Sequence, residues 1–166
     1  FTLKSTPEAK IFWHRDVEDN SVAVATFETV TQQLFIESEV IIQHYNESPL
    51  DFIVSDYAIN YPFKYLANDN FILSSYMVLP NEETRTLLNN WIYNVYKYNE
   101  TIQTYTLLQK LTTYIFKNFT YKVREEAGVQ TAKQTLSYGS GSCRDFAFLF
   151  MEVVKCLGLA TRFVSG

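Results

Sequence analysis

Cysteine is scarce in this chain, and its two cysteines are placed too far apart to bond to each other. Cys143 and Cys156 both fall in one apolar stretch that has the pattern of a helix. A helix rises about 1.5 Å per residue, which separates them by roughly 20 Å, whereas a disulfide needs Cα atoms within about 7 Å of each other. We therefore expect two free thiols, which is typical of a reducing compartment, and we predict a cytoplasmic protein.

Histidine is as scarce as cysteine, since the chain contains only His14 and His44. Both are far from the cysteines in the sequence, and the spacing of these four residues matches no zinc-binding pattern. We therefore expect no metal site, and no other pattern in the sequence indicates a cofactor.

Basic clusters and long apolar runs are also missing. The net charge is −4, and no run of Lys and Arg is present that would indicate binding to nucleic acid or to an anionic membrane. No apolar stretch reaches the roughly 18 to 20 residues that a membrane-spanning helix needs. Hydrophobic residues, by contrast, make up 47% of the chain and aromatic residues 16%. That composition predicts a folded protein with a substantial core.

The first third of the sequence has the pattern of β-strands. Apolar and β-branched residues alternate or run together over residues 10–17, 22–30 and 32–45, with a turn-like segment between the first two. We predict a meander of at least three strands in this region. The apolar segment 71–80 is expected to be a further strand or a buried extended segment.

From Asn81 onward the apolar residues follow helical spacing. We predict helices over residues 81–98, 104–119, 131–136 and 143–157. Asn81 and Thr131 are suitable N-caps, Gly158 is a suitable C-cap, and a last strand is expected over 159–166. Strands followed by helices predict an α+β protein, with an N-terminal antiparallel β domain over residues 1–78 and a second domain over 79–166.

The turn before the last helix carries a cysteine at a chemically favourable position. With Ser142 as N-cap, Asp145 is the third helical residue, and the two form a capping box. Cys143 is then the first helical residue, beside unpaired N–H groups that favour its thiolate. Gly139 and Gly141 allow a sharp turn and a close approach of other groups.

Two interpretations of Cys143 stay open at this point, packing and chemistry. Steps of 100° per residue put Cys143 on one side of the helix with Ala147 and predict that its sulfur faces the packed side. Arg144 and Asp145 fall on the other side, where capping and surface pairing are expected. Free cysteine often packs as a small hydrophobe, which is the interpretation we prefer for Cys156.

Residues 131–166 resemble the active-site segment of the transglutaminase-like superfamily, in its bacterial branch of cysteine proteases. The shared pattern is a short helix ending in Thr-Leu, a Gly-x-Gly-x-Cys turn, Arg-Asp-Phe-Ala, a helix ending at Leu-Gly, and a strand ending in Val-Ser-Gly. The helices over 81–119 match more loosely. Residues 14–27 and 34–45 are similar to the β-rich region that precedes this domain in bacterial members.

The resemblance implies a papain-like α+β fold in which Cys143 is the nucleophile of acyl transfer. It also implies that the backbone N–H of Cys143 is one oxyanion donor, and Tyr121 or Tyr138 is a candidate for a second. The family's histidine and aspartate follow the Val-Ser-Gly strand, so they are expected beyond residue 166. We expect His14 and His44 to be structural or surface residues.

Three hypotheses follow from the sequence. The first is a transglutaminase-like cysteine peptidase or amidase that acts by thiol acyl transfer on a protein or peptide. In it, residues 79–166 are the helical first half of a truncated papain-like domain, and the 166 residues alone are inactive. The second is a non-catalytic binding or assembly module on a degenerate papain-like scaffold, which self-associates through an exposed sheet edge. The third is a β-sandwich module with a helical appendage and no site.

Overall fold

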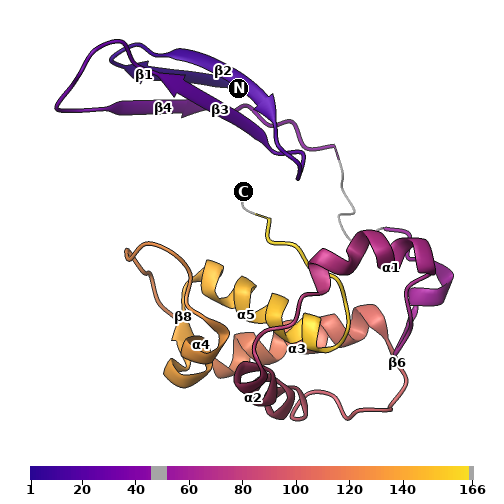
Figure 1. Ribbon diagram of the computed structural model, residues 1–166. Helices are drawn as coiled ribbons and strands as arrows, with labels where there is room; N and C mark the ends of the chain where they lie inside the picture. The colour runs from indigo at the N-terminus through magenta and orange to yellow at the C-terminus, as the bar shows by residue number, and fades with distance from the viewer. Residues whose placement is uncertain (46–51, 165–166) are drawn as a thin grey trace. The chain divides into compact units, whose positions relative to one another are not determined.

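The computed structural model describes residues 1–45 and 52–164 (Figure 1). Contacts divide the chain into two compact units, Phe1–Phe52 and Ile53–Gly166. The first unit is built of antiparallel strands and the second mainly of helices. The predicted α+β class is therefore confirmed, with strands first and helices after them.

Four strands form the N-terminal unit, and they pair as two separate antiparallel ladders. The strands are β1 (Thr2–Thr6), β2 (Lys10–Arg15), β3 (Ser21–Thr26) and β4 (Phe35–Glu39). β2 pairs with β3, and β1 pairs with β4. The predicted meander is therefore right for its first two strands only, because the third segment pairs with a strand that the sequence pattern had not indicated. The strand observed there, β4 (Phe35–Glu39), is also much shorter than the predicted segment 32–45.

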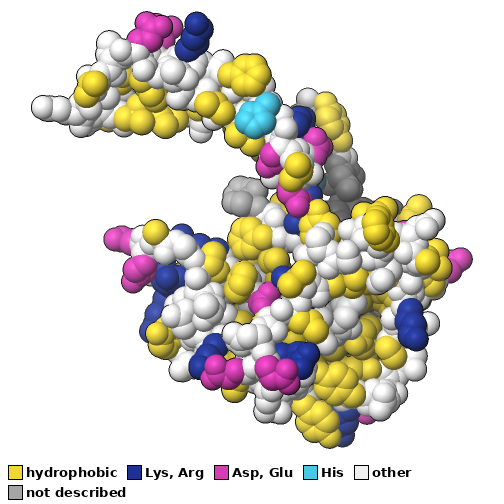
Figure 2. Space-filling view, in the orientation of Figure 1, with side chains coloured by type: hydrophobic (Ala, Val, Ile, Leu, Met, Phe, Trp, Pro, Cys, Tyr) yellow, Lys and Arg dark blue, Asp and Glu magenta, His cyan; other side chains and the backbone are white. Residues whose placement is uncertain are grey.

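The described part of the N-terminal unit contains no buried side chain. Phe12 is 68% exposed, Phe35 is 58% exposed and Val24 is 47% exposed. Figure 2 shows such apolar side chains on the surface of these strands. Short ladders of this kind need a hydrophobic face covered by other elements for independent stability, so the unit offers apolar surface rather than a core.

The second unit is a helical layer with short strands at its turns. Its helices are α1 (Ala67–Leu73), α2 (Glu82–Ile92), α3 (Thr104–Asn118), α4 (Ala132–Tyr138) and α5 (Cys143–Cys156), with 3₁₀ turns at Asp56–Ala58 and Ser74–Met77. The two-residue strands are β5 (Asn60–Tyr61), β6 (Ile102–Gln103), β7 (Thr120–Tyr121) and β8 (Ser140–Gly141). The four predicted helices are all present.

The core of this unit lies where α2, α3 and α5 pack together (Figure 1). Fully buried leucine, isoleucine and valine side chains fill it: Leu88, Ile92, Leu107, Leu111, Leu149 and Val153. Each helix contributes residues three or four apart, as expected for a helix that buries one face. Helix α5 is thereby fixed along its length, and its first residue is held at a defined place.

Neither the strand or extended segment predicted over residues 71–80 nor the strand predicted over 159–166 is found among the described residues. Residues 71–80 fold mostly as the end of α1 and the 3₁₀ turn after it, because an apolar run this short does not distinguish a strand from a helix. Residues 159–164 are irregular, although the Thr161 N–H bonds to the carbonyl of Tyr76 at 3.1 Å. A strand there would need a neighbouring strand to pair with. Gly158 takes the left-handed conformation after α5, as predicted.

The second compact unit begins upstream of residue 79. Tyr61 is buried, and its hydroxyl donates to the carbonyl of Leu157 at the end of α5, at 2.8 Å. Residues from Ile53 onward therefore pack with the helices. The domain boundary predicted between residues 78 and 79 stays a prediction.

We expect Leu111→Ala to lower the free energy of unfolding of the second unit by about 2 to 5 kcal/mol, because Leu111 is 0% exposed and its loss leaves a cavity. Urea denaturation followed by the fluorescence of Trp91, in a Trp13→Phe background, measures this unit alone. Phe116→Ala on the same helix is the control. Phe116 is 84% exposed, so its removal should change the unfolding free energy by no more than about 0.5 kcal/mol. Equal losses in both variants would contradict the packing described for α3.

Candidate active site at the start of helix α5

Helix α4 and the turn after it deliver the chain to Cys143. Thr131 caps α4 together with Gln134, whose side chain accepts from the Thr131 N–H at 2.9 Å. The helix ends at Gly139, which has a left-handed φ of 59° that glycine adopts without strain. The predicted cap and the predicted glycine turn are both present.

Strands β7 and β8 bring a distant segment to this turn. They pair in parallel, with Thr120 opposite Ser140 and Tyr121 opposite Gly141. The Lys122 N–H donates to the carbonyl of Gly141 at 2.8 Å. Tyr121 therefore lies across from a residue that is only two positions before Cys143.

Gly141 is required because no side chain fits at this point. A Cβ atom there would lie 2.9 Å from the Asp145 Cβ and 3.3 Å from the Gln130 Oε1. A Cβ contact below 3.0 Å forces something to move, and here the closest atom belongs to a fully buried side chain. The close approach that the glycine pattern predicted is an approach of the protein to itself.

Helix α5 begins at Cys143, with Ser142 and Asp145 as the predicted capping box. The Asp145 carboxylate accepts from the Ser142 N–H and from its hydroxyl, both at 2.8 Å. Cys143 is thus the first helical residue, beside the free N–H groups of the first turn.

The orientation predicted for α5 is wrong at its first turn. Cys143 and Ala147 are exposed, whereas Asp145 and Leu149 are fully buried. The prediction assumed that two charged residues would face the solvent. Asp145 can be buried because its charge is fully hydrogen-bonded, and this turns Cys143 outward, to a surface that a substrate can reach.

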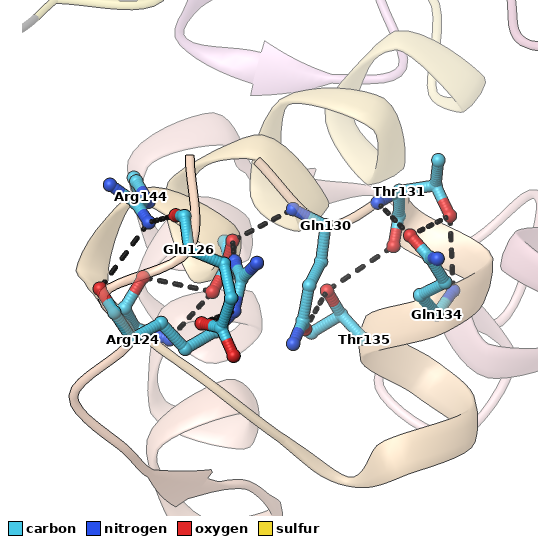
Figure 3. A network of polar contacts seen from close by, with 9 residues as sticks. Arg124, Glu126, Gln130, Thr131, Gln134, Thr135 and Arg144 are labelled. Carbon is cyan, nitrogen blue, oxygen red and sulfur yellow. Dashed lines mark hydrogen bonds and ion pairs between the residues drawn. The ribbon is translucent and has the colours of Figure 1, made fainter. Parts of the chain in front are cut away.

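Asp145 is the centre of a buried polar network, and Figure 3 shows its neighbours Arg124 and Gln130. Besides Ser142, its carboxylate accepts from the Arg124 guanidinium at 2.6 Å and from the Gln130 N–H at 2.8 Å. The Asp145 side chain is 0% exposed and that of Arg124 is 17% exposed. Surface pairing, the role expected of Asp145, is therefore corrected to a buried ion pair.

The pKa of Asp145 lies well below its ordinary value as a result of this network. Burial alone would raise the pKa, because it disfavours the charged form. The N–H groups of Gln130 and Ser142 and the Arg124 guanidinium outweigh that effect. Asp145 is therefore a fixed negative charge at neutral pH.

Arg144 holds the same segment from the other side. Its guanidinium donates to the backbone carbonyls of Arg124, at 3.4 Å, and of Glu126 (Figure 3). Arg144 was expected to pair at the surface, but it binds backbone and is half-buried. Residues 124–126 are therefore tied to the first turn of α5 by two arginines.

Of the two candidate tyrosines, the structure brings Tyr121 to Cys143. The negative charge of the Cys143 thiolate raises the pKa of Tyr121 above its ordinary value, and a side-chain hydrogen bond with Cys143 adds to that effect. Tyr138, at the end of α4, is 62% exposed. The contacts found among the described residues do not join Tyr138 to Cys143.

The second cysteine has a different environment on the same helix. Cys156 is half-buried, and burial, followed by the charge of Glu152, raises the pKa of its thiol to about 11. It contacts the hydrophobic core, in agreement with the packing interpretation. Both cysteines are free thiols, as predicted.

Both histidines lie in the N-terminal unit and are exposed. His14 stacks on Phe12, with ring centroids 6.3 Å apart. Within residues 1–45 and 52–164, no three Cys, His, Asp or Glu side chains gather in a way that could hold a metal ion. The same part of the chain contains no helix that is long and apolar enough to cross a membrane.

Sequence reasoning missed the partners of Asp145. Arg124 and Gln130 lie in a polar segment without periodicity, and nothing in their spacing connects them to residues that come 15 to 21 positions later. Thr135, whose hydroxyl donates to the Gln130 side chain at 3.1 Å, is also fully buried. The only local signal was the capping box, which identified Asp145 but not its ion pair.

We expect the stability of this unit to fall in acid through Asp145. A pKa that is lower in the folded than in the unfolded state stabilises the fold above the unfolded value. That contribution is lost progressively as the pH falls from about 5, because the carboxylate of the unfolded chain becomes protonated before that of the folded protein. Asp145→Asn should therefore unfold more easily at neutral pH and show a flatter decline in acid, as measured by urea denaturation at several pH values.

Thr135→Ala is the matched control for the acid experiment, because it removes a buried neutral member of the same network. Thr135→Ala should lower the free energy of unfolding at every pH without changing how steeply that free energy declines in acid. If Asp145→Asn kept the full acid slope of the parent protein, the assignment of that slope to Asp145 would be wrong.

The contact between Tyr121 and Cys143 predicts a change in tyrosine ionisation. Cys143→Ser removes the thiolate charge that opposes formation of the phenolate, so the pKa of Tyr121 should fall toward its ordinary value. Carbon NMR of the tyrosine rings, with Tyr121→Phe for assignment, measures it. Cys156→Ser should leave Tyr121 unchanged, and an unchanged Tyr121 in Cys143→Ser would refute the contact.

Comparison with known proteins gives a family match and a structural match. Residues 96–166 match the family model described as the transglutaminase-like superfamily. No curated protein matches the chain.

One solved structure is similar over almost the whole chain. It is a protein from Cytophaga hutchinsonii that carries the name “Putative Cysteine Protease”. The TM-score is 0.57 and the sequence identity 16%, and the match covers 96% of this chain but 52% of the other. At this identity the likeness shows a shared fold, and the chain spans about half the length of that protein. Residues 96–166, which contain Cys143 and the network around Asp145, belong to the transglutaminase-like superfamily.

Proposed function

We propose that this protein is a cysteine peptidase or amidase of the transglutaminase-like superfamily, with Cys143 as its nucleophile. The observation that carries this proposal is the exposed Cys143 at the first position of α5, with Tyr121 paired opposite Gly141, two residues before it. The family of residues 96–166 supports the general kind of chemistry. The substrate class we propose is a protein or peptide amide.

In the first step, the thiolate of Cys143 attacks the amide carbonyl carbon, and the C–O π electrons move to the oxygen. The backbone N–H of Cys143 would donate to that oxyanion, because it is one of the unpaired donors of the first helical turn. Tyr121 is the better candidate for a second donor, because the pairing of β7 with β8 places it opposite Gly141, beside the turn that leads to Cys143; Tyr138 is the other.

In the second step, the C–N bond breaks and the amine leaves with a proton, which gives a thioester on Cys143. Water then gives a proton to the same base as it adds to the thioester, and the adduct releases the carboxylic acid and the Cys143 thiolate. Both steps need a group that gives and takes a proton. We propose that the histidine and its aspartate are supplied by residues beyond 166, as the resemblance to the active-site segment of the family implies. The 166 residues alone would then not turn over, and water, rather than an amine, would be the ordinary acceptor.

A binding or assembly role is the second candidate, and one observation favours it. The described strands of the N-terminal unit leave apolar side chains such as Phe12 and Phe35 exposed. Strands with open edges and apolar faces can pair with another chain or a second copy. The two free thiols support our placement of either activity in the cytoplasm.

The proposal predicts that Cys143 reacts with iodoacetamide faster than Cys156 by about tenfold or more at neutral pH, because thiolate character and exposure control alkylation. Mass spectrometry of the labelled peptides measures both rates in one sample. The rates should converge in the urea-unfolded chain, which is the control for intrinsic differences.

Labelling of Cys143 no faster than that of the unfolded chain would count against a catalytic thiol and favour the binding module. In a longer protein that contains these residues, Cys143→Ala should abolish amide hydrolysis, whereas Cys156→Ala should retain it. Full activity in Cys143→Ala would refute the assignment of the nucleophile.

A further inference from the structure

The ion pair between Arg124 and Asp145 spans two segments that only the site brings together. Asp145 lies two positions after Cys143, and Arg124 lies three positions after Tyr121. The pair is short, at 2.6 Å, and its carboxylate is 0% exposed. Its two ends therefore tie the nucleophile's helix to the segment that carries the tyrosine.

Burial of this pair is not explained by helix capping alone. Ser142 supplies two donors to Asp145, and a cap of that kind works equally well at a surface. Arg124 and Gln130 are additional, and both come from outside the helix. Because desolvation offsets much of the attraction within a buried ion pair, such a pair contributes little net stability but can fix one geometry.

The segment that carries Tyr121 is held at both ends. Before Arg124, the Lys122 N–H bonds to the carbonyl of Gly141 at 2.8 Å. At Arg124 and Glu126, the backbone carbonyls accept from the Arg144 guanidinium (Figure 3). Tyr121 is 56% exposed, so few packing contacts hold its ring, and its backbone ties decide where the hydroxyl lies.

We propose that Asp145 and Arg124 are positioning residues, which hold Tyr121, paired across β7 and β8 with Gly141, beside the start of α5 and Cys143. Asp145 does not touch the substrate in this scheme. It fixes Arg124, which fixes the backbone of residues 121–126 and thereby the place of the Tyr121 side chain at the first turn of α5. The inference rests on the proposed function of Cys143.

The test is the alkylation rate of Cys143 by iodoacetamide at slightly acid pH, in the whole 166-residue chain with Cys156→Ser. A hydrogen bond to a charged group changes the thiolate population about tenfold or more. A more basic thiolate is also more nucleophilic, which offsets part of that loss. Tyr121→Phe and Asp145→Asn should each slow the reaction by about three- to tenfold.

The double variant separates positioning from general loosening of the fold. If Asp145 acts through Tyr121, Asp145→Asn should cause no further slowing in the Tyr121→Phe background. Glu152→Gln is the matched control, because it neutralises another buried carboxylate on α5, one that pairs with Lys155 at 3.1 Å. It should leave the rate of Cys143 unchanged. Additive slowing, or equal slowing by Glu152→Gln, would overturn the proposal.

If Asp145→Asn does not fold, Arg124→Met is the alternative variant. In Arg124→Met the Asp145 carboxylate keeps its donors from Gln130 and Ser142, so the fold should be retained. The same slowing is expected, and an unchanged rate in the folded variant would overturn the proposal. A parent protein whose Cys143 reacts no faster than in urea would instead refute the proposed function. The two failures are therefore distinguishable.

Discussion

The geometry of the candidate site depends on the hydrogen bonds that the buried carboxylate of Asp145 accepts. This carboxylate accepts hydrogen bonds from three segments: the turn at Ser142, the loop at Gln130 and the side chain of Arg124. A buried charge with this many donors is stable only if all of them stay in place, because each lost donor leaves desolvated charge unpaired. The network therefore acts as a unit, and the close approach of Gly141 to Asp145 is part of it.

The helical core supplies the frame for that network, but it does not define the site. Leu111, Leu149 and Val153 hold α5 against its neighbours by apolar burial, which is insensitive to small rotations of the helix. Hydrogen bonds depend on distance and angle, so Asp145 fixes the rotation that apolar packing leaves loose. That rotation places Asp145 inside and Cys143 outside.

Local signals in the sequence were sufficient for the helices after residue 81 and their caps, but not for the strands or for the face that helix α5 turns toward the core. Asn81, Thr131 and Ser142 cap helices as predicted, because capping is decided within four residues. The direction of Cys143 depends on Arg124, and no local rule connects the two. The prediction of strand pairing failed for the same reason. Strand β4 pairs with β1, and the choice of a partner strand depends on residues far apart in the chain.

Helix α5 shows how position alone separates two thiols of the same chain. Cys143 lies at the start of the helix, exposed, with unpaired N–H groups and a tyrosine beside it. Cys156 lies at the end of the helix against the core, where burial and the nearby Glu152 raise the pKa of the thiol to about 11. At neutral pH that thiol is protonated, and the dipole at a helix C-terminus disfavours a thiolate as well. A protein that needs one reactive sulfur can therefore retain a second one on the same helix, provided that the second lies at the opposite end and is packed.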